Sequence, residues 1–374
     1  MSDGPFAGYA DLPAHLANVP VAAFPGDEPR ARLAEILGLR VPATAAAAGV
    51  SVDREWMLDG VAGREVSWHT GFGPRTRAYL LTPADHDGNL PGLLGLHCHG
   101  GVRSTGAEQL VVTDRAAHPS AQRLRGQYYD GRALANDLAR DGFAVLVHDT
   151  FSWGSRAFDL SQPTPKLAAL AEALDARWRE QGDAPTDDER FDAVSSLHED
   201  HLAKGLGVLG ASLAGMVAAD DLTALDVLAG LSEVDANSLG VFGLSGGGGR
   251  AILAAALDPR VKATVVSCMM STGSALVPEY LDAHSWLLHS PGLAAWRDLP
   301  RLAAMTAGDV LVQYGRTDPL FPREGMTEAH ARLSAGLDAR YTGAFFDAGH
   351  EWTAQMQDAA RAWLAAHAAS TPRS

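Results

Sequence analysis

The sequence predicts an α/β fold built on a doubly wound, mostly parallel sheet of eight strands. Three observations predict it: a hairpin pattern early in the chain, short apolar runs after the hairpin, and helical patterns between those runs. The runs are too short for helices and too apolar for exposed strands, which favours buried parallel strands. Because strands and helices alternate, we expect helices on both faces of one sheet.

Each expected element follows from a local pattern. Two alternating segments, 64–69 and 76–81, flank Gly71-Phe72-Gly73-Pro74 and predict the hairpin. The six apolar runs that predict the remaining strands are 93–97, 144–148, 239–244, 263–267, 310–314 and 341–346. Apolar residues at helical spacing predict helices over 131–140, 222–231, 250–257, 327–337 and 353–366.

The chain divides into an N-terminal helical extension, residues 1–55, and one α/β domain, residues 56–374. In the extension Leu33, Ile36 and Leu37 share one helical face, and Gly38 follows as a helix terminator. Two long connections interrupt the domain, at about 150–205 and 269–308. Long connections in a compact fold tend to carry binding function, so we expect both to cover a pocket.

Composition excludes several classes of protein. The chain has 374 residues with 30 basic and 45 acidic side chains, a net charge of −15, which argues against binding to nucleic acid or to an anionic membrane. Two cysteines cannot form a disulfide framework. The first 20 residues do not resemble a signal peptide, and no run of ~20 apolar residues is present. We therefore expect a soluble, cytoplasmic protein, and a homo-oligomer remains open.

The most informative segment is Gly-Leu-Ser-Gly-Gly at 243–247, which lies between a strand pattern and a helix pattern. A serine at such a tight turn is exposed at the edge of the sheet, and the helix N-terminus points toward it. A phosphate-binding loop is the alternative, but the Walker pattern needs Lys followed by Ser or Thr, and here Arg250 precedes Ala251. The dinucleotide-binding fingerprint also fails, so the segment indicates Ser245 as a nucleophile.

A serine nucleophile needs a base, and the base needs an orienting acid. His350 is the expected base because it lies in a glycine-flanked loop directly after a strand. Asp318 is the expected acid because it follows the strand at 310–314 and precedes a proline, outside any helix. Asp347, three residues before His350, is the rival acid.

The oxyanion of the transition state needs amide donors. One is expected from Gly246 and the other from Gly101 or Val102, in the loop that starts His97-Cys98-His99-Gly100. The two histidines and the cysteine of this loop could suggest a metal cluster, but no third ligand on one face is evident. We expect no metal and no cofactor.

With these residues the chain resembles the α/β-hydrolase superfamily, and within it the branch of dienelactone hydrolases and acetyl xylan esterases. The resemblance spans about residues 60–370 and is carried by 97–101, 131–149, Trp153-Gly154-Ser155-Arg156, the serine turn, 315–318 and 349–351. It implies a Ser-His-Asp hydrolase of carboxylic esters. The sequence departs from dienelactone hydrolases proper, whose nucleophile is cysteine, because Ser245 holds that position.

The expected reaction is hydrolysis of a small-molecule ester with a short acyl or acetyl group, through an acyl-enzyme. Trp286 is predicted either to line the pocket or to anchor the core, and Arg156 either to bind an anion or, as we favour, to pair with a structural carboxylate such as Asp149. The alternatives are an amide, peptide or lactone hydrolase with the same three residues, and a non-hydrolytic binding module. The expected pocket residues are His99, Trp153, Arg156, His284 and Trp286.

Overall fold

The computed structural model describes residues 6, 8–18, 28–40, 49–277 and 279–367. The prediction of no signal peptide in residues 1–20 falls partly outside these residues, as does part of the predicted extension. Within the extension the structure has two helices, α1 (Leu12–Asn18) and α2 (Glu28–Leu37). Gly38 follows α2 with φ of 61°, as expected for a residue that ends a helix.

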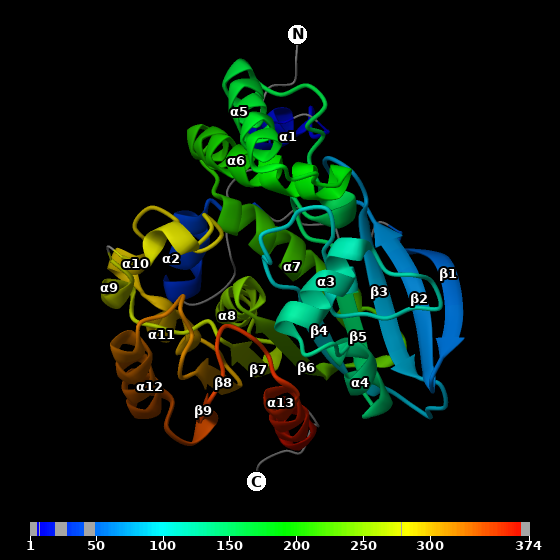
Figure 1. The fold of residues 1–374 in the computed structure, drawn as a ribbon. Coiled ribbons are helices and arrows are strands. Elements are labelled where there is room, and N and C mark those ends of the chain that lie inside the picture. Colours follow the sequence, from blue (N-terminus) through cyan, green and yellow to red (C-terminus); the bar gives the residue numbers. More distant parts are fainter. Residues whose placement is uncertain (1–5, 7, 19–27, 41–48, 278, 368–374) are drawn as a thin grey trace.

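A single sheet organises the molecule, and its strands run in the order β1-β2-β3-β5-β4-β6-β7-β8-β9 (Figure 1). The first four strands in this order pair antiparallel, and from β5 to β9 all neighbours are parallel. The strands are β1 (Ser51–Leu58), β2 (Val61–Trp68), β3 (Thr76–Pro83), β4 (Leu90–Leu96), β5 (Ala144–His148), β6 (Val234–Leu244), β7 (Val261–Ser267), β8 (Asp309–Gly315) and β9 (Tyr341–Phe346). The predicted fold class is confirmed.

One strand was not predicted. The sheet has nine strands because β1 lies at its edge, and residues 51–55 therefore belong to a strand and not to the helical extension. Only Trp56 of β1 is buried, and four of the first five residues of the strand are polar, so neither an apolar run nor a clean alternation marks it in the sequence. Its pairing with β2 explains why it forms nonetheless.

Helices cover both faces of the sheet. α7, α8 and α12 pack on one face, and α4 and α13 pack on the other. The helices after α2 are α3 (Pro119–Tyr128), α4 (Leu134–Arg140), α5 (Pro165–Gln181), α6 (Asp187–Val208), α7 (Leu213–Ala229), α8 (Gly246–Leu257), α9 (Gly273–Leu276), α10 (Leu293–Trp296), α11 (Leu299–Ala303), α12 (Arg323–Leu337) and α13 (Ala354–His367). The core is continuous through the sheet because adjacent strand residues face opposite sides: Val241 packs with one group of helices and Phe242 with the other.

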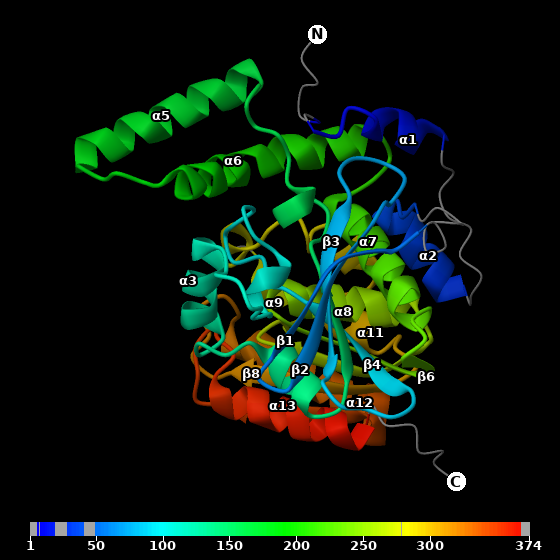
Figure 2. The same ribbon diagram turned by 90° about the vertical axis from the view of Figure 1, so that its right-hand side faces the viewer.

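The first long connection, between β5 and β6, contains α5, α6 and α7. Figure 2 shows α5 and α6 side by side as an arm that extends beyond the body of the molecule. The arm has defined ends: Thr164 caps α5, and Thr186 with Glu189 forms a capping box on α6. The base of α6 is buried against the body, and this places Glu199 near the carboxyl ends of the parallel strands.

Among the described helices, none is by itself long and apolar enough to cross a membrane. Taken as a pair, α6 and α7 have a suitable length and composition, but they are bent by 85° where they meet, and α7 is buried.

Candidate functional site

Ser245 lies in a sharp turn between β6 and α8, with φ of 54° and ψ of −124°. A non-glycine residue rarely adopts this conformation, so the surrounding structure must impose it. Two glycines make the turn possible. A Cβ on Gly243 would lie 2.3 Å from the carbonyl carbon of Gly247, and a Cβ on Gly247 would lie 2.0 Å from the carbonyl oxygen of Leu96. The chain can pass so close to itself only with glycine at both positions.

The three residues expected to form a triad lie in hydrogen-bonding distance of one another. Ser245 Oγ is 2.7 Å from His350 Nε2, and His350 Nδ1 is 2.8 Å from Asp318 Oδ2. Because an ionised carboxylate only accepts hydrogen bonds, Nδ1 carries the proton and Nε2 is left to accept the hydroxyl of Ser245. The side chain of Asp318 is buried, whereas that of the rival Asp347 is 94% exposed and pairs with Arg316. The geometry therefore favours Asp318.

The oxyanion loop, residues 97–103, differs from expectation. The amide of Gly101 donates to His99 Nδ1 at 3.0 Å, and the amide of Val102 donates to the carbonyl of His99 at 3.3 Å. Both predicted donors are thus engaged within the loop, because positive φ values at Gly100 and Gly101 turn the chain back on His99. The main-chain nitrogen of His99 lies 3.1 Å from the position of a Cβ on Gly246, so it is the loop amide that flanks the serine turn.

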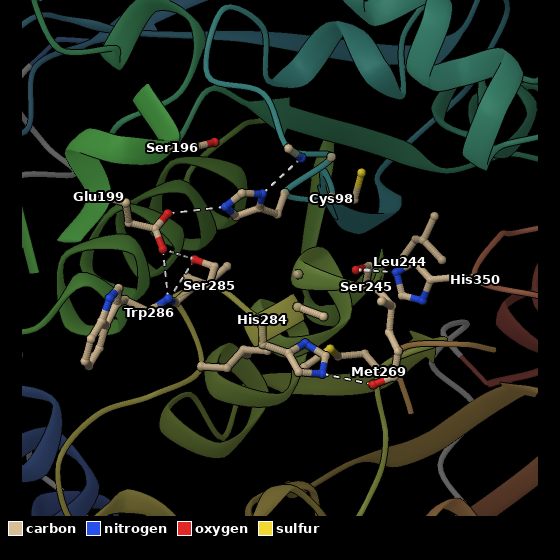
Figure 3. Close-up of a pocket in the computed structure, with 18 of the residues that line it drawn as sticks. Cys98, Ser196, Glu199, Leu244, Ser245, Met269, His284, Ser285, Trp286 and His350 are labelled. Atoms are coloured by element: carbon tan, nitrogen blue, oxygen red, sulfur yellow. Dashed lines mark hydrogen bonds and ion pairs between the residues drawn. The ribbon is translucent and has the colours of Figure 1, made fainter. Parts of the chain in front are cut away.

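These groups open into a cavity of about 400 Å³, shown in Figure 3. Of the predicted residues, His99, Gly101, Ser245, Gly246, His284, Trp286 and His350 line it. Others that line it were not predicted: Tyr128, Ser196, Glu199, Asp200, Met269, Asp282, Ser285, Leu287, Leu288 and Leu320. Most of the unpredicted residues come from the two long connections, which were expected to cover a pocket, but nothing in the sequence indicated which of their residues line it.

Known proteins resemble the chain in sequence and in fold. The family model described as acetyl xylan esterase (AXE1) matches residues 171–270, a segment that contains Ser245. YtaP of Bacillus subtilis (strain 168), named as a hydrolase, is 25% identical over 260 residues, which are 69% of this chain and 70% of YtaP.

Two solved acetyl xylan esterases share the architecture. Acetyl xylan esterase 1 from Thermoanaerobacterium sp. JW/SL YS485 is 16% identical, with a TM-score of 0.53 over 94% of this chain and 98% of that chain. The enzyme from Paenibacillus sp. R4 is 17% identical, with a TM-score of 0.55 over 95% and 99%. The chain has the α/β-hydrolase fold. The resemblance expected from the sequence is confirmed.

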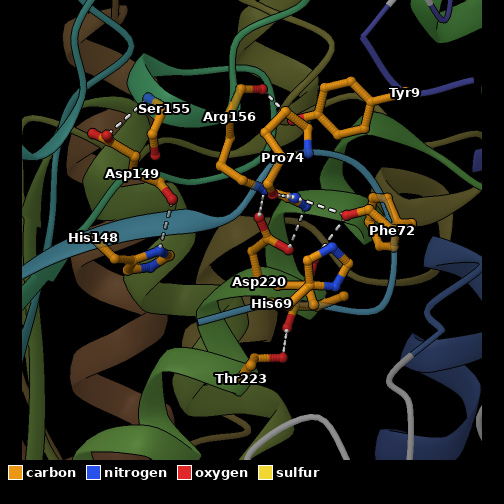
Figure 4. A network of polar contacts seen from close by, with 12 residues as sticks. Tyr9, His69, Phe72, Pro74, His148, Asp149, Ser155, Arg156, Asp220 and Thr223 are labelled. Atoms are coloured by element: carbon orange, nitrogen blue, oxygen red, sulfur yellow. Dashed lines mark hydrogen bonds and ion pairs between the residues drawn. The ribbon is translucent and has the colours of Figure 1, made fainter. Parts of the chain in front are cut away.

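Trp153 and Arg156 do not line the pocket, which corrects the prediction for both. Trp153 is 1% exposed and lies behind His99, to whose carbonyl its Nε1 donates at 3.4 Å. Arg156 is fully buried and donates to Asp220 at 3.2 Å and to the carbonyl of Phe72 at 3.0 Å (Figure 4). Arg156 is therefore structural, as favoured, but its partner is Asp220.

Asp149, the expected partner of Arg156, has other partners. Its carboxylate accepts hydrogen bonds from the amides of Ala107 and Ser155, at 2.8 Å and 2.9 Å. It also pairs with Arg77 at 3.3 Å. The short sequence separation suggested a pair of Asp149 with Arg156. Instead, Asp149 stabilises the turn after β5, and the partner of Arg156 is Asp220 on α7.

His284 and Trp286 both lie on the pocket wall. Burial lowers the pKa of His284, and its Nε2 lies 3.1 Å from the carbonyl of Leu320, to which the neutral ring donates. Trp286 is 44% exposed, and its Nε1 donates to Asp200 at 2.7 Å. Of the two roles left open for Trp286, the structure favours the pocket.

The two cysteines lie near the site but are buried. Burial raises the pKa of the Cys98 thiol to about 11 and that of Cys268 to about 12, so neither is a nucleophile at neutral pH. Within the described part of the chain, no group of three or more His, Cys, Asp or Glu residues is arranged to hold a metal ion.

Proposed function

We propose that this α/β-hydrolase is a carboxylic ester hydrolase that uses Ser245 as its nucleophile and takes short-chain acyl esters, acetyl esters among them. The observation that carries the proposal is the hydrogen-bond chain from Ser245 through His350 to Asp318, which opens into a cavity of about 400 Å³. The acetyl xylan esterase family match, which includes the serine turn, supports esters as the substrate class.

In the proposed reaction His350 Nε2 takes the proton of Ser245 as its Oγ attacks the ester carbonyl. The amide of Gly246 and the amide of His99 donate to the oxyanion, and each such donor typically contributes about 3 kcal/mol. His350 then gives the proton to the leaving alcohol, and water hydrolyses the acyl-enzyme in the same way. Asp318 holds His350 in the tautomer that the first step requires.

The choice of His99 over Gly101 and Val102 as second donor follows from the loop geometry. Among the described residues no acceptor is found for the His99 amide, whereas the other two amides donate to His99 itself. The amide of Gly246 is the first of α8, and the N-terminus of a helix favours negative charge.

Replacing Ser245 by alanine tests the proposal. Ser245→Ala should lower the rate of aryl acetate hydrolysis by about a thousandfold or more, with an unchanged urea midpoint. Ser196→Ala is the matched control, because Ser196 is an exposed serine of the same pocket, and it should stay within about twofold of wild type. A Ser245→Ala protein with more than a tenth of the activity would overturn the proposal.

Comparison of an aryl acetate with the corresponding aryl acetamide separates ester from amide hydrolysis. We expect turnover of the ester only. Equal turnover of the amide would replace ester by amide hydrolysis as the function of the same three residues.

A further inference from the structure

Glu199 of α6 lies near the base of the arm, and its carboxylate contacts two other segments of the pocket wall. It is 8% exposed, and both of its carboxylate oxygens accept hydrogen bonds. Oε2 accepts from His99 Nε2 at 3.3 Å and from Arg103, and Oε1 accepts from Ser285 Oγ at 2.7 Å and from the amide of Trp286 at 2.8 Å. One side chain of α6 therefore joins the oxyanion loop to the second long connection.

The carboxylate of Glu199 is ionised. Burial on its own would raise its pKa, but the hydrogen bond from His99, the charge of Arg103 and the hydrogen bond from Ser285 outweigh burial and hold the pKa well below the usual range. All four neighbours are donors, so an acceptor-only group fits this position and an amide does not.

The contacts of His99 fix its tautomer. Its Nδ1 accepts a hydrogen bond from the amide of Gly101, so the ring proton is on Nε2, which donates to Glu199. Burial and the charge of Arg103 lower the pKa of His99, in keeping with a neutral ring. Since both ring nitrogens are engaged, the ring cannot turn without losing two hydrogen bonds, and the backbone of His99 is held with it.

We propose that Glu199 is a positioning residue of the oxyanion hole: through the ring of His99 it fixes the His99 main-chain nitrogen beside Gly246. The inference rests on the proposed function. Figure 3 shows Glu199, Ser285 and Trp286 on one side of the pocket and Ser245 with His350 on the other, so Glu199 acts across the pocket and does not touch the reacting atoms. The same carboxylate also holds the pocket wall in place at Ser285 and Trp286, so α6 is part of the active site.

Glu199→Gln is the informative change. Glutamine has nearly the same shape as glutamate, but its NH2 group is a donor and would replace one of the two oxygens that each accept two hydrogen bonds. We expect kcat for aryl acetate hydrolysis to fall about 10- to 100-fold, less than the loss of a whole oxyanion donor, with KM changed less than threefold.

Asp188→Asn is the matched control. Asp188 also lies on α6 and also meets a histidine nitrogen, that of His118 at 3.3 Å, but it lies outside the pocket. This variant should keep kcat within about twofold of wild type.

The route through His99 is tested with His99→Ala, which leaves Glu199 its contacts with Arg103, Ser285 and Trp286 and so should fold. This variant should lose kcat by a factor similar to Glu199→Gln. Adding Glu199→Gln to it should cost less than threefold more, because two residues that act in one chain are not additive. Urea midpoints of all variants show whether a loss of kcat reflects a loss of folded protein.

Two results would overturn the inference: kcat of Glu199→Gln within twofold of wild type, or the same fold-loss from Glu199→Gln with and without His99→Ala. If Glu199→Gln does not fold, His99→Ala decides, and wild-type kcat in that variant would also overturn the inference. Either result alongside an inactive Ser245→Ala protein removes only this inference. An active Ser245→Ala protein removes the proposed function itself.

Discussion

Replacement of Arg250 by methionine should lower the free energy of unfolding by much more than replacement of an exposed arginine. Arg250 lies on α8 five residues after Ser245, and it is 2% exposed. Its guanidinium donates to Asp221 at 2.6 Å and 3.0 Å and to the carbonyl of His97 at 3.1 Å. His148 Nε2 lies 3.0 Å from the same Asp221 carboxylate. The cluster connects the serine turn, α7 and the start of the oxyanion loop.

The magnitude follows from the burial of Asp221. Arg250→Met removes the hydrogen bonds to Asp221 and to the carbonyl of His97, and it leaves a carboxylate that is 1% exposed without its cation. Breaking a buried ion pair in this way typically costs about 3–5 kcal/mol of unfolding free energy. Burial alone would raise the pKa of Asp221, but the charge of Arg250 and hydrogen bonds from His148 and Arg250 lower it from 3.8 to about 2. Asp221 therefore contributes stability above about pH 4, and this stability is lost as the pH falls toward 2.

The assay is urea unfolding at pH 7, followed by far-UV circular dichroism. Arg32→Met is the control, because Arg32 pairs with Glu35 on the surface with side chains 52% and 60% exposed, and it should change the unfolding free energy by less than about 0.5 kcal/mol. Adding Asp221→Leu to Arg250→Met should recover part of the loss by removing the unpaired charge. A cost below about 1 kcal/mol for Arg250→Met would refute the reasoning.

Two further predictions concern the site. Asp318→Asn should lower kcat for aryl acetate hydrolysis by roughly a thousandfold or more, because an amide does not hold His350 in the required tautomer. Asp347→Asn changes an exposed side chain and should keep kcat within about twofold of wild type. The reverse ranking of the two variants would make Asp347 the acid. Cys98 and Cys268 should resist iodoacetamide in the folded protein at pH 8, since alkylation needs the thiolate and pKa values of about 11 and 12 leave roughly one thiol in a thousand or fewer ionised. Mass spectrometry should find both alkylated only in urea, and rapid modification of the native protein would contradict the assigned burial.

The sequence predicted those parts of the fold in which burial requires a run of apolar residues. The eight predicted strands are all present, and residues 239–244 are apolar throughout because this part of β6 is buried on both faces of the sheet. β1 escaped detection because it is a solvated edge strand stabilised by its pairing with β2. Of the arm, only the long connection that contains it was predicted, because the polar surfaces of α5 and α6 resemble that of a long loop.

For the site, the sequence indicated the residues whose order and local pattern are tied to chemistry. Ser245, Asp318 and His350 each follow a strand, so their convergence could be predicted from the topology. The amide directions of the oxyanion loop could not, because they depend on positive φ values at Gly100 and Gly101. Nor could the partners of Arg156 and Glu199, which lie far from them in the sequence.

The central claim, that Ser245 is the nucleophile, is tested most directly by covalent labelling with an aryl phosphonate, whose adduct on a catalytic serine is stable. The account predicts one phosphonyl group per chain on the peptide that contains Ser245, and activity lost in proportion to labelling. The Ser245→Ala protein should remain unlabelled. A fully active protein that carries no label, or inactivation with the label on another residue, would contradict the account.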